Sequence, residues 1–205
     1  LWTLEKSYHV SGEGYAVRGH IKEGPKHVFA KDNDTLKEVL LGGFFADNAR
    51  IQAPDKKHVR YQILGDPTEA CLEVVARKGK VDVEAELKNT PRVKELPFDS
   101  SRKMMTVIQS SDGTHRFNTY TKGAPNCVVD KCTSYLEHGE IKPITQKIKD
   151  KIMRANDGYA KDGLRVLAVA GRNLDQKMMN NLDSATIETV EENLTFLGLT
   201  VMMDP

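Results

Sequence analysis

Hydrophobic and polar residues alternate along several stretches of the chain with the two-residue period of β-strands. Residues 102–122 alternate on both sides of the turn tripeptide Ser111-Asp112-Gly113, so they predict a β-hairpin. Residues 4–10 and 15–21 predict a strand pair, with glycines between them for the turn. Three more strands are predicted at 58–64, 164–172 and 194–203.

Residues 66–79 carry the most complete set of helix signals in the chain. Asp66 can cap the helix, Pro67 suits its first position, and Glu69 lies where a capping box places an acidic residue. Gly79 ends the helix. The apolar stripe is predicted to consist of Cys71, Val74 and Val75.

Four other segments have the three-to-four-residue spacing of an amphipathic helix. Residues 32–50 form one of them, although Gly42 and Gly43 weaken it by ~1 kcal/mol each relative to alanine. The other helices are predicted at 83–89, at 124–131, and at 144–159 with Ile148, Ile152 and Met153 facing the core.

The order of these elements predicts the fold class. Adjacent strands form hairpins, and no regular alternation of strand and helix occurs, which favours an antiparallel sheet. We therefore expect an α+β fold with a mainly antiparallel twisted sheet flanked by helices on both sides. Residues 1–205 should form a single domain, and the apolar strand-like segments at both ends indicate that it belongs to a longer chain.

The composition is that of an ordinary water-soluble domain. Hydrophobic residues make up 39% and charged residues 29%, with a net charge of +1. This balance argues against a nucleic-acid partner, which would require a basic excess or patch. No apolar run approaches the ~18 residues of a membrane span, so we expect no direct membrane contact and a monomer.

The common motifs of catalysis and metal binding are missing from the sequence. It contains no G-x-x-x-x-G-K-S/T loop, no G-x-G-x-x-G after a strand and no nucleophile elbow. The six histidines form no cluster with the spacing of metal ligands, so we expect no metal site. Cys71, Cys127 and Cys132 are an odd set without C-x-x-C spacing, which predicts buried or inert thiols.

Four short stretches remain, and each has an ordinary structural explanation. In GDPTEA, Glu69 can complete a capping box, and in PFDSSRK, Phe98 can be a core aromatic residue at the start of a strand. In TKGAP, Lys122 can be a solvated strand end. In GLRVLAVA, Arg165 and Leu167 share one face of a strand that is otherwise suited to burial, and a buried arginine is costly unless an anion meets it.

Taken together, GDPTE, PFDSSRKMMTV, KGAP and GLRVLAVA resemble the nucleotide-binding domain of P-type cation-transporting ATPases, in particular the calcium-pump-like, type II group. The resemblance covers essentially the whole chain. It implies a cytoplasmic ATP-binding domain of an integral membrane pump that transports a cation, Ca²⁺ on this likeness. Its partners would be ATP or ADP and the phosphorylation and actuator domains of the same pump.

The resemblance also implies a role for each residue of the site. Phe98 would stack on adenine, Glu69 would accept a hydrogen bond from the adenine amino group, and Leu167 would pack against base or ribose. Met105 would line the same pocket. Lys122 would line the pocket with a positive charge, beside Gly123, whose missing side chain would let the nucleotide approach closely, and Arg165 would reach the phosphates.

One position departs from the pattern of animal calcium pumps, which carry arginine two residues after the phenylalanine. Here that position is Ser100, and Arg102 or Lys103 could supply the missing positive charge. Asp204 and Pro205 resemble the start of the hinge that leads back to the phosphorylation domain.

The sequence leaves three functions open. The D-K-T-G-T motif of the phosphorylated aspartate is not in this chain, so a pump domain would position the ATP γ-phosphate for an aspartate elsewhere, with Mg²⁺ bound in the phosphorylation domain. A free-standing ATP-dependent phosphotransferase would need its own magnesium carboxylates. The available pairs, Glu84 with Glu86 and Glu191 with Glu192, are expected on solvated faces. A non-catalytic interaction module is the third possibility.

Overall fold

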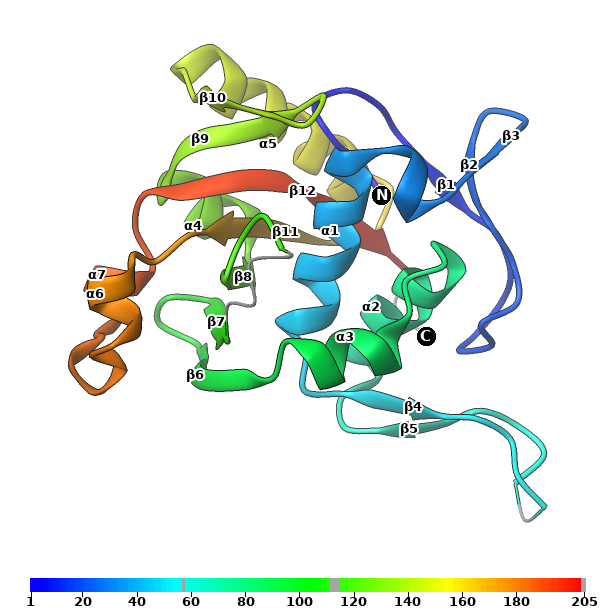
Figure 1. Ribbon diagram of the computed structural model, residues 1–205. Helices are drawn as coiled ribbons and strands as arrows, with labels where there is room; N and C mark the ends of the chain where they lie inside the picture. The colour runs from blue at the N-terminus through cyan, green and yellow to red at the C-terminus, as the bar shows by residue number, and fades with distance from the viewer. Residues whose placement is uncertain (57, 111–114, 204–205) are drawn as a thin grey trace.

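The computed structural model describes residues 1–56, 58–110 and 115–203. Its centre is a seven-stranded sheet with the strand order β10-β9-β12-β11-β8-β7-β6 (Figure 1). All neighbouring strands are antiparallel except β12 and β9. The strands of this sheet are β6 (Arg92–Asp99), β7 (Met104–Gln109), β8 (Thr119–Gly123), β9 (Cys132–Glu137), β10 (Glu140–Pro143), β11 (Arg165–Arg172) and β12 (Leu194–Met202).

Helices cover both faces of the sheet, as the sequence predicted. The alternation along β11 shows this directly, because Val169 packs in the cluster of α1 (Asp34–Phe45) whereas Ala168 and Ala170 pack in the cluster of α4 (Pro125–Asp130) and α5 (Gln146–Lys161). The mainly antiparallel α+β class is therefore confirmed.

Helix α1 lies unusually close to the sheet. It starts at the N-cap Asn33, whose side chain accepts a 2.7 Å hydrogen bond from Leu36 N. A methyl group at Gly42 would come within 2.6 Å of Val169 Cγ1 and 2.9 Å of Tyr120 Cδ1, so only glycine fits there. The helix ends at Phe45 instead of reaching residue 50, because Arg50 already belongs to strand β4.

Helix α2 (Pro67–Lys78) begins and ends where its signals predicted. Asp66 caps it by accepting hydrogen bonds from Thr68 N at 2.7 Å and Glu69 N at 3.3 Å. The capping box itself does not form, because the Glu69 carboxylate turns toward Asn48 and the end of β8. Helix α3 (Val83–Asn89) follows.

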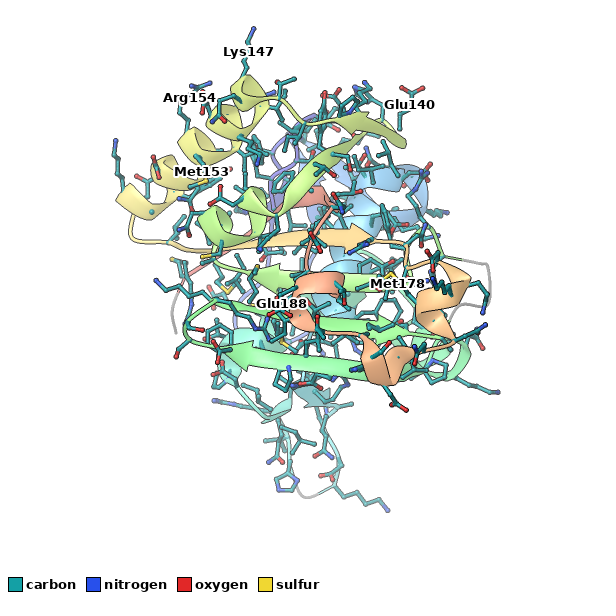
Figure 2. The ribbon with its side chains drawn as sticks, turned by 90° about the vertical axis from the view of Figure 1, so that its left-hand side faces the viewer. Glu140, Lys147, Met153, Arg154, Met178 and Glu188 are labelled. Atoms are coloured by element: carbon teal, nitrogen blue, oxygen red, sulfur yellow. The ribbon has the colours of Figure 1, made fainter. Side chains whose placement is uncertain are left out.

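The face of the sheet opposite α1 carries α5 at one end and a short helical excursion at the other. Figure 2 looks onto this face, with Lys147, Met153 and Arg154 marking α5 and with Met178 and Glu188 lying in front of the lower strands. Met153 is only half-buried and lies outside the core that Ile148 and Ile152 join, so its predicted inward position is wrong. The excursion consists of α6 (Gln176–Met179), η2 (Leu182–Ser184) and α7 (Ile187–Val190).

Two small sheets lie beside this core. The predicted N-terminal strand pair exists but is short, and a third strand joins it. The turn of the predicted hairpin, 111–114, lies outside the described residues, whereas its two strands β7 and β8 pair as expected. One small sheet consists of β1 (His9–Val10), β2 (Ile21–Glu23) and β3 (Lys26–Val28), and the short 3-10 helix η1 (Ala30–Asp32) follows it in the chain. The other consists of β4 (Arg50–Gln52) and β5 (Gln62–Leu64), which form the projecting hairpin of Figure 1.

Candidate functional site

A cavity of about 490 Å³ lies where the end of β8, the start of β11 and the first turn of α2 meet. The register places Ala168 opposite Gly123, which brings the beginning of β11 beside the end of β8. The turn between β6 and β7 closes another side. The candidate residues that line this cavity are Glu69, Phe98, Ser100, Lys103, Lys122, Gly123, Arg165 and Leu167.

Phe98 lies near the end of β6, at an irregularity in the pairing between β6 and β7. Its side chain is 61% exposed at the cavity, so the explanation as a core aromatic residue is wrong. The strand extends from Arg92 to Asp99, and the residue therefore ends a strand instead of preceding one. An exposed ring beside a cavity offers an apolar face to a flat ligand.

Lys122 is buried, with its side chain only 6% exposed, and is not the solvated strand end considered above. Its Nζ lies 2.9 Å from Glu69 Oε1, but no hydrogen bond of good geometry reaches this ammonium from the described residues. An ammonium has three donors, and the ion pair with Glu69 can engage only part of them, so the others stay unused in a buried place, which is costly. The position therefore suits a ligand with negatively charged or strongly accepting oxygens.

Glu69 is the partner of Lys122 and is ionised. Burial is the largest single influence and acts to raise its pKa, but the Lys122 ammonium, the Asn48 N–H, which donates a 3.2 Å hydrogen bond to Oε2, and the Asp47 side chain together outweigh it. The net result is a lowered pKa. Glu69 and Lys122 thus form a charged pair on the floor of the cavity.

Asp47 stands beneath this pair and was not predicted from the sequence. It follows α1 in a loop, is fully buried, and accepts a 2.7 Å hydrogen bond from Ala49 N. Burial raises the pKa of Asp47 to about 8, against the opposing pull of Lys122. A single acidic residue after a helix has no sequence signal that distinguishes it from an ordinary loop residue.

Gly123 lines the cavity, yet its missing side chain has a reason within the protein. A methyl group there would clash with the Lys103 carbonyl oxygen and come within 2.7 Å of Met104 Cγ. The close approach of β7 to β8 therefore requires glycine at this position, whatever the cavity holds.

Arg165 begins β11 and is exposed, so it bears none of the burial cost expected for an arginine on a buried strand. Its Nη1 donates a 3.2 Å hydrogen bond to Thr68 Oγ1 at the start of α2. Leu167 lies two residues further along β11, is half-buried and also lines the cavity. The two residues face the cavity from the same side of the strand, as predicted.

Arg102 and Met105 do not line the cavity. Arg102 Nη1 lies 2.5 Å from Glu191 Oε1, and its Nη2 donates to the Pro97 carbonyl oxygen. Glu191 is buried and also accepts a 2.6 Å hydrogen bond from Thr106, so its expected solvated position is wrong. Met105 is 1% exposed in the core.

Of the two cations offered as replacements near Ser100, only Lys103 faces the cavity. Arg102 instead fixes the turn between β6 and β7, because it donates a hydrogen bond to the Pro97 carbonyl oxygen and forms an ion pair with the buried Glu191. The sequence could not distinguish these neighbours, because their directions depend on a glutamate 89 positions away.

The family described as P-type ATPase, cytoplasmic domain N matches residues 35–205. The chain belongs to this family. Over its full length it is 31% identical to a calcium-transporting ATPase of Bacillus subtilis, of which it spans 22%. It is 37% identical over 69% of its length to calcium-transporting ATPase 1 of Bacillus cereus, and 32% identical over 70% to calcium-transporting ATPase 1 of Lactococcus lactis. The chain spans about a fifth or less of these curated relatives.

This N domain shows no sign of a second reactive centre among its described residues. Its three cysteines are free, and burial raises the pKa of Cys71 and Cys132 to about 12. Over 1–56, 58–110 and 115–203, no group of three or more acidic, histidine or cysteine side chains could hold a metal, and no helix has the length and apolarity to cross a membrane. The hinge residues Asp204 and Pro205 lie outside the described residues.

Proposed function

We propose that this N domain binds ATP or ADP in the cavity between β8, β11 and α2. The observation that carries the proposal is the pairing of an exposed aromatic ring, Phe98, with a buried ammonium, Lys122, on one cavity. Adenine has flat apolar faces that can stack on the ring, and its ring nitrogens can accept a hydrogen bond from the ammonium beside Glu69. A nucleotide base therefore matches both features.

The remaining cavity residues fit the two ends of the same ligand. Leu167 supplies apolar surface beside the base or ribose, and Glu69 offers a carboxylate to the adenine amino group. Lys103 and Arg165 supply exposed positive charge for the phosphates, and Ser100 lines the same cavity. Gly123 contributes open backbone at the wall.

We further propose that the domain serves a P-type pump for Ca²⁺, the ion named for its bacterial relatives. In that pump it would sit on the cytoplasmic side of a membrane protein, beside the phosphorylation and actuator domains. Its contribution is to hold the γ-phosphate near an aspartate of the phosphorylation domain, where Mg²⁺ would bind. Well-oriented positioning of this kind can supply about 7 to 11 kcal/mol of the barrier.

Calorimetric titration of the purified 205-residue chain with ATP, with and without Mg²⁺, tests the proposal. Stacking plus a few polar contacts on an open cavity predicts a Kd of roughly 0.1 to 1 mM, with little effect of Mg²⁺. Release of phosphate by clean protein would favour a free-standing phosphotransferase. Absence of any binding at 10 mM ATP, a saturating level on this estimate, would favour an interaction module.

A further inference from the structure

Asp47 presents an unusual arrangement of hydrogen-bond acceptors beneath the cavity. One of its oxygens accepts from Ala49 N at 2.7 Å, while Oδ2 is buried and meets no donor among the described residues. Glu69 lies close by, because Asn48, the residue that follows Asp47, donates a 3.2 Å hydrogen bond from its main-chain nitrogen to Glu69 Oε2, and a hydrogen bond from Asp47 is among the causes that lower the pKa of Glu69. Glu69 is itself an acceptor, already engaged with Lys122 and Asn48.

Two neighbouring ionised carboxylates cannot hydrogen-bond to each other, because neither has a donor, and their charges repel in a buried place. A single proton between them removes both problems. It gives Asp47 Oδ2 a partner and lets one ammonium, Lys122, balance one carboxylate, Glu69.

Among the described residues no cation forms an ion pair with the Asp47 carboxylate, and the charge of Arg50 acts on its pKa less than that of Lys122 does. From β6, Arg92 donates to the main-chain oxygen of Asp47 at 2.7 Å, and Arg50, on the same segment, also donates to that oxygen, at 3.2 Å. The titratable and charged groups that face Asp47 are Lys122 from β8, Glu69 and Cys71 from α2, Arg92 from β6 and Arg50 from its own segment.

We propose that Asp47 is a positioning residue: as a neutral acid it donates a hydrogen bond to Glu69 and so holds the Glu69–Lys122 pair in place beneath the bound nucleotide. The role beneath a nucleotide rests on the proposed function, whereas the neutral state of Asp47 does not. The floor of the cavity then carries no net charge. Loss of the proton adds one negative charge below an anionic ligand and draws Lys122 toward Asp47.

The pH range of this change follows from burial, which raises the pKa of Asp47 to about 8. An unfolded aspartate releases its proton near pH 4. Between these values the folded chain binds one proton more than the unfolded chain, so Asp47 makes folding less favourable as pH rises from about 4 to about 8. Above pH 8 the effect is constant.

Melting temperatures of wild type and Asp47→Asn, measured without nucleotide from pH 5 to 9, test the neutral acid directly. The asparagine keeps a donor for Glu69 but has no proton to lose. We expect the melting temperature of Asp47→Asn to rise relative to wild type as pH increases to about 8, and the difference then to level off. Asp183→Asn, which changes an exposed aspartate, should keep a constant difference from wild type.

The affinity for ADP and ATP over pH 7 to 9.5 tests the positioning role. Wild type should lose roughly two- to tenfold in affinity as Asp47 ionises, since one more charge opposes the phosphates. Asp47→Asn should match wild type at pH 7 and stay flat to pH 9.5. Adenosine, which lacks phosphate, should show no such loss with either protein.

The two sets of measurements separate the possible failures. A flat difference in melting temperature, or a ¹³C carboxyl resonance of Asp47 in wild type that does not shift near pH 8, overturns the neutral acid even if Asp47→Asn folds poorly. If the difference in melting temperature grows with pH as expected but the ATP affinity of both proteins depends equally on pH, the positioning role is overturned. If the difference in melting temperature grows with pH as expected but neither protein binds nucleotide, the proposed function is refuted, whereas the neutral state of Asp47 is supported.

Discussion

At the residue scale, the exposure of Phe98 allows the effect of a substitution on ATP binding to be distinguished from its effect on folding stability. Its ring is 61% exposed, so Phe98→Ala removes little packing from the folded chain. Base–aromatic stacking is worth ~1 to 3 kcal/mol by such substitutions. We expect Phe98→Ala to weaken ATP binding by that amount in calorimetry while the melting temperature changes little.

Ile141→Ala is a matched control, because Ile141 is 50% exposed on β10 and lies away from the cavity. It should leave both ATP affinity and melting temperature almost unchanged. A buried phenylalanine cut to alanine costs ~3 to 5 kcal/mol of folding free energy. A loss of that size for Phe98→Ala, with ATP affinity intact, would return Phe98 to a purely structural role.

Sequence could predict that Phe98 and Lys122 lie near one another, because short motifs mark both positions and the predicted hairpin of β7 and β8, which ends at Lys122, begins shortly after Phe98. It could not predict which way Arg102 and Lys103 point. That choice depends on Glu191, which comes from a distant part of the chain and lies buried in the folded core. Asp47 escaped prediction for a similar reason, because only the packing of α2 and β8 around it makes its carboxyl group unusual.

At the element scale, the two adjacent glycines of α1 should respond in opposite ways to alanine. Alanine favours a helix by ~1 kcal/mol over glycine. At Gly43 the nearest atom to a new methyl group would be Leu72 Cδ2 at 3.6 Å, an ordinary contact, so Gly43→Ala should stabilise the chain by roughly 0.5 to 1 kcal/mol. At Gly42 the same methyl group would strike Val169 and Tyr120 in the sheet, and such overpacking costs ~1 to 3 kcal/mol.

Urea denaturation of the two variants measures both changes under the same conditions. Equal stabilisation by Gly42→Ala and Gly43→Ala would mean that α1 does not press on the sheet at Gly42. The result also bears on the cavity, because α1 packs on β8 and β11, two strands whose residues line the cavity.

Elements with strong local signals were predictable, and those defined by their neighbours were not. The caps of α2 at Asp66 and Gly79 need only adjacent residues, and they placed the helix correctly. Strand β6 was missed because Pro97 and several charged residues interrupt its alternation, which an edge strand of a sheet tolerates. Strand β4 was not predicted, and its first residue, Arg50, was assigned to the helix 32–50, since the three residues of β4 gain strand character only by pairing with β5.

At the scale of the whole molecule, the antiparallel class could be inferred from the order of hairpins and helices. The parallel pairing of β12 with β9 could not, because it joins strands that are separated by α5 and by β11. This arrangement leaves the cavity on one end of the sheet, bounded by four separate segments of the sequence. A site of this kind depends on the complete fold, so binding and folding should be thermodynamically linked.

We therefore expect ATP and ADP to raise the melting temperature of the chain without being hydrolysed. At 10 mM nucleotide and a Kd of roughly 0.1 to 1 mM, linkage adds about 1.4 to 2.7 kcal/mol to folding. For a domain of this size, 1 kcal/mol shifts the melting temperature by about 2 to 4 °C, so the rise should be roughly 3 to 10 °C. Inorganic tripolyphosphate, which has the charges but no base to stack on Phe98, should raise the melting temperature less than ATP does, and Phe98→Ala should remove most of that advantage of ATP.

Phosphate should stay at background throughout a long incubation with Mg²⁺, because the aspartate that would receive it is expected in another domain. A larger rise with tripolyphosphate than with ATP would mean that charge alone governs binding, and steady phosphate release would mean that the chain carries its own catalytic groups.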